Sequence, residues 1–130
     1  KYTVFLDTYT ADYRTFLEKY NSASNEQKIA YNINKVFAAI NDGDYKYVYN
    51  KLDSTFRSSN FKNEASFENY AKSTFFSNNT IKSDGYEVNG DVYIYNMIIT
   101  NSNDDSKKIS KTIIMKLKEG TDFVMSFNVK

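Results

Sequence analysis

The hydrophobic period of this chain changes near residue 80, and that change limits the folds open to it. Before residue 80 apolar residues recur at helical spacing, whereas after it they alternate with polar residues as in strands. Asn89-Gly90 lies between two β-rich runs, and this dipeptide is the typical loop of a two-residue hairpin. The pattern predicts helices first and then an antiparallel meander of about four strands, which is a segregated α+β fold.

The strand expected over 91–101 is apolar on both faces, which predicts a central strand with a packed layer on each side. In 108–118 and 122–130 apolar and polar residues alternate, so one face of each strand should point to a core. Five lysines lie on or near the third strand: Lys107, Lys108, Lys111, Lys116 and Lys118. They either meet an anionic surface or form the solvated face of an edge strand, where lysine discourages strand pairing.

Three or four helices are expected ahead of the sheet. Apolar stripes at helical spacing place them over 11–20, 25–41 and 63–76, with one more after Asp44. The clearest is 25–41, because Ser24 and Gln27 form a capping box at its start. The segment 55–61 is expected to be irregular or a short strand, and 2–9 to be a short strand.

The run Asn41-Asp42-Gly43-Asp44 precedes tyrosines at every second position. It can be interpreted as a metal loop, as a hairpin entering an aromatic strand, or as a break between two helices. It lacks the ligand spacing of a calcium loop. Gly43 suits the left-handed position that ends a helix, and Asp44 suits the N-cap of the next one. We therefore predict a second helix whose apolar stripe faces the core: Tyr45, Val48, Tyr49 and Leu52.

The composition excludes several classes of chemistry. The chain has no cysteine and no histidine, which excludes thiol catalysis, disulfides, Ser-His arrangements and Cys-ligated metals. Its net charge is +1 and it has no basic block, so we expect no nucleic-acid partner. No apolar run reaches the length of a membrane span. We predict no cofactor, no metal and no catalytic residue.

The phrase "VFAAINDGDYKYVYNKLD" resembles the corner between two helices of NTF2-like domains, which are also called SnoaL-like or cystatin-fold domains. There a first helix ends in A-x-N-x-G-D and a second begins on the Asp; the matching residues are Ala39, Asn41, Gly43 and Asp44. The order of elements agrees over 24–130, which leaves 1–23 as an N-terminal strand and helix extension. The resemblance implies a cone, in which a bent sheet wraps over helices around a pocket.

Composition adds a second resemblance. The chain is rich in Lys, Asn, Tyr and Ile, like the extracytoplasmic NTF2-like domains of low-GC Gram-positive bacteria. It starts with Lys1 rather than Met, so we expect a piece of a longer envelope protein that is anchored through a segment outside this chain. Some members of the family are isomerases or hydrolases with an Asp and a His or Tyr in the cone, and many are binding or assembly modules. No catalytic Asp can be matched here.

Five tyrosines are candidates for a ligand pocket: Tyr45, Tyr49, Tyr86, Tyr93 and Tyr95. Their rings could stack on a planar ligand or pack as ordinary core and rim. An Asp–Tyr pair could instead catalyse an enolisation, with the Tyr hydroxyl donating to the oxyanion. Asp84 and Asp91 are the acids nearest in sequence, and both are expected to be exposed beside turns.

Two hypotheses of function follow. The first is a non-enzymatic binding or assembly domain of a bacterial envelope protein that recognises a protein or a small apolar or aromatic ligand, with a homo-oligomer through the sheet among the expected states. The alternative is a small-ligand pocket protein or isomerase-like enzyme that uses Asp and Tyr in the cone. A cone filled by apolar side chains would argue against the alternative.

Overall fold

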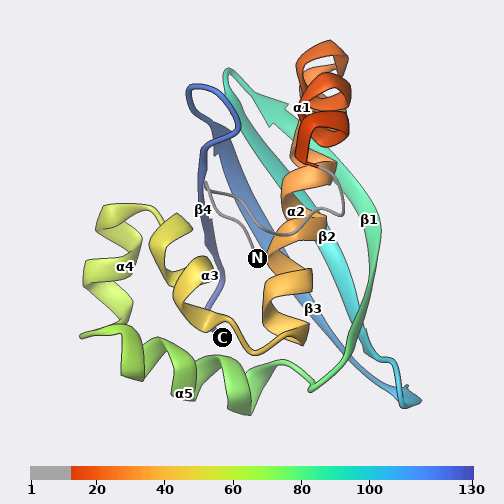
Figure 1. Ribbon diagram of the computed structural model, residues 1–130. Coiled ribbons are helices and arrows are strands. Elements are labelled where there is room, and N and C mark those ends of the chain that lie inside the picture. Colours follow the sequence, from red (N-terminus) through yellow and green to blue (C-terminus); the bar gives the residue numbers. More distant parts are fainter. Residues whose placement is uncertain (1–12) are drawn as a thin grey trace.

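A computed structural model describes residues 13–130, with side chains from residue 16 onward. Within that range five helices precede four strands (Figure 1), which confirms the predicted α+β class. The elements are α1 (Tyr13–Ser22), α2 (Asn25–Asn41), α3 (Tyr45–Lys51), α4 (Ser54–Asn60), α5 (Glu64–Thr74), β1 (Asn79–Asn89), β2 (Val92–Asn101), β3 (Asp104–Leu117) and β4 (Phe123–Phe127). The strand expected over 2–9 lies outside the described residues.

Helix α2 begins and ends where the sequence predicts. The Ser24 hydroxyl accepts from the Gln27 N–H at 3.2 Å, and the Gln27 side chain accepts from the Ser24 N–H at 3.1 Å. At the other end Gly43 takes a φ of 76°, and the Asp44 carboxylate caps α3 by accepting from the Tyr47 N–H at 3.1 Å. The interpretation of this corner as a break between two helices is therefore confirmed.

The prediction of irregular or strand structure over 55–61 is wrong, because α4 occupies most of that segment. The Asp53 carboxylate accepts from the Phe56 N–H at 3.1 Å and so begins the helix. The Phe56 ring then packs against Phe61 and Phe127, with ring centroids 5.9 and 5.0 Å away. A helix this short is marginal alone, so the cap and the ring contacts stabilise it rather than helix propensity.

The four strands form one antiparallel sheet in the order β1-β2-β3-β4. Asn89 pairs with Val92 across the predicted hairpin turn, in which Gly90 has a φ of 65°. Figure 1 shows a strongly curved sheet with the helices gathered on its inner side. The inner residues of β2 are buried against these helices: Tyr93, Tyr95, Met97 and Ile99.

A second packed layer over β2 was also expected, and that prediction is wrong for the described part of the chain. Val92, Ile94 and Ile98, on the outer face, are only partly buried, while every inner-face residue between them is buried. Ile114 pairs with Ile94 and remains 37 % exposed. The partial burial comes from neighbouring strands, so the described helices cover one face of the sheet only.

Helix α1 joins this framework through aromatic contacts. The Phe16 ring packs at a tilt against Tyr20 and edge-on against Tyr31, with ring centroids 5.4 and 6.0 Å away. The division into an extension over 1–23 and a domain over 24–130 stays a prediction. None of the described helices combines the length and the apolar character that a membrane crossing requires.

Candidate functional site

The space between the helices and the β3–β4 half of the sheet is filled by side chains. The cavity there has a volume of only about 10 Å³, which is room for about one water molecule. Its lining is almost wholly apolar: Val36, Phe37, Ile40, Val48, Phe67, Phe75, Lys111, Ile113, Met125 and Phe127. Edge-to-face ring pairs pack this interior, such as Phe61 against Phe67 at 5.1 Å. The interior therefore offers no room for a ligand.

Lys111 lines this interior, whereas the sequence predicts it among the solvated lysines of an edge strand. That expectation is wrong for Lys111, which is 5 % exposed. Its ammonium donates to the Tyr70 hydroxyl and the Asn128 carbonyl, both at 2.8 Å, and to the Val129 carbonyl at 3.3 Å. The Tyr70 hydroxyl in turn donates to the Val129 carbonyl at 2.8 Å. The lysine thus holds the chain after β4 against α5.

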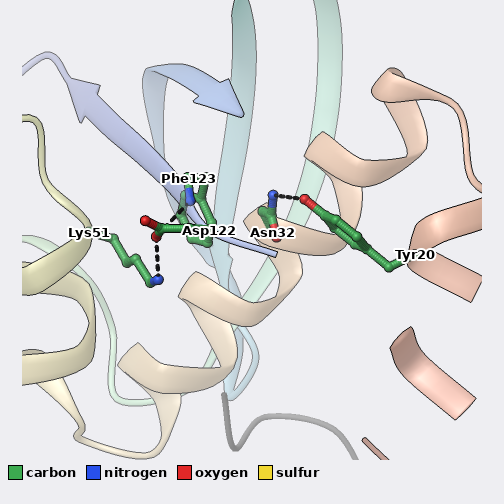
Figure 2. A network of polar contacts seen from close by, with 5 residues as sticks. All are labelled: Tyr20, Asn32, Lys51, Asp122 and Phe123. Carbon is green, nitrogen blue, oxygen red and sulfur yellow. Dashed lines mark hydrogen bonds and ion pairs between the residues drawn. The ribbon is translucent and has the colours of Figure 1, made fainter. Parts of the chain in front are cut away.

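Two other polar contacts join elements around α2 (Figure 2). The Asn32 amide donates to the Tyr20 hydroxyl at 3.2 Å, while the amide oxygen of Asn32, fully buried, has no hydrogen-bond partner among the described residues. The Lys51 ammonium pairs with the Asp122 carboxylate at 2.8 Å, and the same oxygen accepts from the Phe123 N–H at 2.8 Å. The Asn32–Tyr20 hydrogen bond connects α2 to α1, and the Lys51–Asp122 pair connects α3 to the β3–β4 turn.

Replacing Asp122 by Asn should lower the free energy of unfolding by less than about 1 kcal/mol at pH 7, because the pair is partly exposed. Partial burial acts to raise the pKa of the Asp122 carboxyl, but the hydrogen bond and charge of Lys51, the Phe123 N–H and the charge of Lys118 together outweigh it, so that pKa lies below its ordinary value. The stability that the Lys51–Asp122 pair contributes is therefore fully present above the ordinary carboxyl pKa, about 3.9. It is lost as pH falls through the pKa of Asp122 in the folded state.

Urea unfolding of wild type and Asp122→Asn at pH 7 and pH 3 checks this expectation. The difference between the two proteins should shrink at pH 3, and an undiminished difference would contradict it. Asp91→Asn is the matched control, because Asp91 pairs with Lys116 at a longer 3.5 Å and has a 74 % exposed side chain. Its effect at pH 7 should be smaller.

A cleft opens on the inner side of the sheet between α2 and β1. We name it the α2–β1 cleft; its lining is Ala30, Ile33, Asn34, Ile81, Ser83, Tyr95 and Met97. Its volume is about 160 Å³, and an apolar cavity of about 150 Å³ is large enough for benzene. Ile33, Tyr95 and Met97 are buried and form an apolar floor, while Asn34 and Ser83 are exposed. The cleft can therefore take one aromatic or branched aliphatic group.

The cleft exists because small side chains face each other across it. Helix α2 presents Ala30 and Asn34 toward β1, where a larger residue would fill the space. On the strand side the pairing with β2 shifts between Ser83 and Tyr86, which marks a β-bulge. Gly85 has a φ of 105° in this bulge, a conformation that side-chain-bearing residues rarely adopt. The bulge bends β1 beside the cleft.

An aromatic pair lies next to the cleft. The rings of Tyr86 and Tyr95 stack with centroids 4.8 Å apart and planes at 11°. Tyr86 is 47 % exposed, and Val88, two residues further on the same face, is 45 % exposed. Burial raises the pKa of the Tyr95 hydroxyl, and the charges of Tyr86 and Glu26 raise it further, so Tyr95 is neutral at pH 7. This end of the cleft offers an exposed ring and an un-ionised hydroxyl.

The structure therefore brings together only part of the predicted tyrosine set. Tyr86 and Tyr95 stack beside the cleft, and Tyr93 is buried further along β2. Tyr45 and Tyr49 lie on α3 and do not line the cleft. Tyr49 packs on Phe67, with ring centroids 6.1 Å apart. Whether any of the five contacts a ligand stays a prediction.

Acidic residues do not gather into a site for chemistry. In the part of the chain that the structure describes, no three His, Cys, Asp or Glu side chains lie close enough to hold a metal ion. Asp84 and Asp91, the acids considered for an Asp–Tyr pair, are exposed. The α2–β1 cleft is therefore the candidate functional site, and the geometry suits it for binding.

Comparisons with known proteins add no relative: no protein-family model, no curated protein and no solved structure matches this chain.

Proposed function

We propose that this chain is a non-enzymatic binding or assembly domain of a bacterial envelope-associated protein, and that it binds a partner through the α2–β1 cleft. The fold of the domain is proposed to be NTF2-like, which the helix corner at Asn41–Asp44 and the curved sheet after the helices support. An extracytoplasmic location, with an anchor outside this chain, belongs to the same proposal and is supported by composition.

One observation carries the binding role: apolar surface lies open at the cleft, while the interior is filled. Tyr86 and Val88 are two of the three exposed large hydrophobic residues in the described chain; Tyr86 stacks on Tyr95 of the cleft, and Val88 follows it on the same face of β1. An apolar patch beside a cleft with a polar rim is typical of a recognition site. The alternative function, an Asp–Tyr enzyme in the cone, gains no support from an interior cavity of about 10 Å³.

The proposal is tested by titrating the ¹⁵N-labelled domain with N-acetyl-L-phenylalanine amide and following its amide resonances by NMR. Because the cleft accommodates one apolar side chain, we expect saturable shifts that are confined to the cleft lining. Shifts that are absent or scattered over the surface would overturn a binding role for this cleft.

A pair of variants on one helix makes the test specific. Ala30→Phe should fill the cleft and abolish the shifts, because Ala30 is part of its lining. Ala38→Phe is the matched control: Ala38 is another exposed alanine of α2 that does not line the cleft, so binding should persist. Loss of binding in both variants would show that the cleft is not the site.

A further inference from the structure

Among the described residues, no strand pairs with the outer edge of β1. β1 is at one edge of the sheet, and all its residues from Lys82 to Asn89 are exposed. At the opposite edge β4 is covered: the Asp53 N–H donates to the Met125 carbonyl at 2.8 Å, and Leu52 forms a parallel bridge with Met125. An uncovered edge strand can accept a strand of another chain.

Asn41 shows which residues of β1 face this edge. The Asn79 N–H donates to the Asn41 side chain at 2.7 Å, and the Asn79 carbonyl accepts from it at 3.2 Å. Both backbone groups of Asn79 therefore point away from β2. Because this direction alternates along an antiparallel strand, Ile81 and Ser83 present their N–H and C=O groups to the same edge. Asn41 occupies the Asn79 groups, so added pairing would stop there.

These two residues also wall the α2–β1 cleft with their side chains. A strand paired to Ile81 and Ser83 would lie about 4.8 Å beyond β1, and its opposing residues would point to the same face. We propose that an extended segment of the partner adds to β1 as a fifth strand and places one aromatic or branched side chain in the cleft. This inference rests on the proposed function and names the kind of partner.

Charge along this edge favours a basic segment. Three acidic residues lie near Tyr86: Glu26 on α2, and Asp84 and Glu87 on β1. None of them belongs to an ion pair among the described residues. Lys82 is the one lysine of β1. β1 thus carries two carboxylates, Asp84 and Glu87, and one ammonium, and this excess of negative charge attracts a cationic partner. The exposed Tyr86 ring can also receive a Lys or Arg side chain on its free face.

The test uses the synthetic peptide acetyl-KTVTFTR-amide, whose Val and Phe share one face and whose ends are basic. We expect saturable NMR shifts at Ile81 and Ser83 and slower hydrogen exchange of their amides. N-methylation of the Val and Phe amides, which would face β1, should weaken binding at least about tenfold, equivalent to about 1.4 kcal/mol. N-methylation of two Thr amides, which would face away, should leave binding nearly unchanged. The acidic analogue acetyl-ETVTFTE-amide should bind more weakly than the basic peptide.

The outcomes separate this inference from the function on which it rests. Equal affinity of the two N-methylated peptides would overturn strand addition, and binding of N-acetyl-L-phenylalanine amide at the cleft would still support the proposed function. Tighter binding of the acidic analogue would overturn the basic partner. Failure of both the peptide and the amino-acid amide to bind would overturn both proposals.

Discussion

Replacing Phe67 by alanine is expected to lower the free energy of unfolding by about 3–5 kcal/mol, the range for truncation of buried Phe. Phe67 has no exposed surface, and its ring contacts Tyr49 on α3 and Phe61 after α4, with centroids 6.1 and 5.1 Å away. The substitution leaves a cavity where three helical segments meet. Since domains of this size are stable by only about 5–15 kcal/mol, the loss is a large share of the total.

Urea unfolding followed by circular dichroism measures this loss, with tyrosine fluorescence as the second probe because the chain has no Trp. Phe67→Leu should cost less, since it keeps most of the apolar volume. Tyr86→Ala is the control for removing a ring from the surface and should change stability by less than about 1 kcal/mol. Similar costs for Phe67→Ala and Tyr86→Ala would contradict the packing that we describe.

The parts of the fold that the sequence predicted are those where a local signal and the tertiary structure agree. Ser24 with Gln27, Gly43 with Asp44, and Asn89 with Gly90 each define a boundary within a few residues. Helix α4 was missed because its stability depends on Phe61 and Phe127, which no local pattern links to it. The two-sided apolar pattern of β2 wrongly predicts a second packed layer for a related reason. The outer face of β2 is half-buried by its neighbouring strands alone.

The candidate site was predictable only in part. Aromatic composition identified Tyr86 and Tyr95, yet the cleft depends on the small residues Ala30 and Asn34 and on a bulge in β1. Small residues on an amphipathic helix carry no signal of what they face. The burial of Lys111 did have a signal: it lies midway between Ile109 and Ile113, and residues two apart on a strand share a face. The charge of Lys111 nevertheless favours a prediction of solvent exposure.

Replacing Lys111 by Glu is expected to cost about 3–5 kcal/mol, the range for an uncompensated buried charge. The Lys111 ammonium donates to the carbonyls of Asn128 and Val129, so a carboxylate in its place would face two acceptors in a site that is 5 % exposed. Lys111→Met keeps an unbranched side chain and removes the charge. It also leaves the Asn128 and Val129 carbonyls without this donor, so we expect Lys111→Met to cost about 1–3 kcal/mol, less than Lys111→Glu.

Urea unfolding at pH 7 and pH 4 measures both variants and isolates the effect of charge. Burial raises the pKa of an introduced carboxyl above its unfolded value, so the stability lost in Lys111→Glu should return as pH falls, and the gap to Lys111→Met should narrow at pH 4. Lys108→Glu and Lys108→Met are matched controls on the exposed face of β3, and both should remain close to wild type. Equal stability of Lys111→Glu and Lys108→Glu at pH 7 would contradict the burial of Lys111. It would also contradict the contacts by which Lys111 holds the chain after β4 against α5.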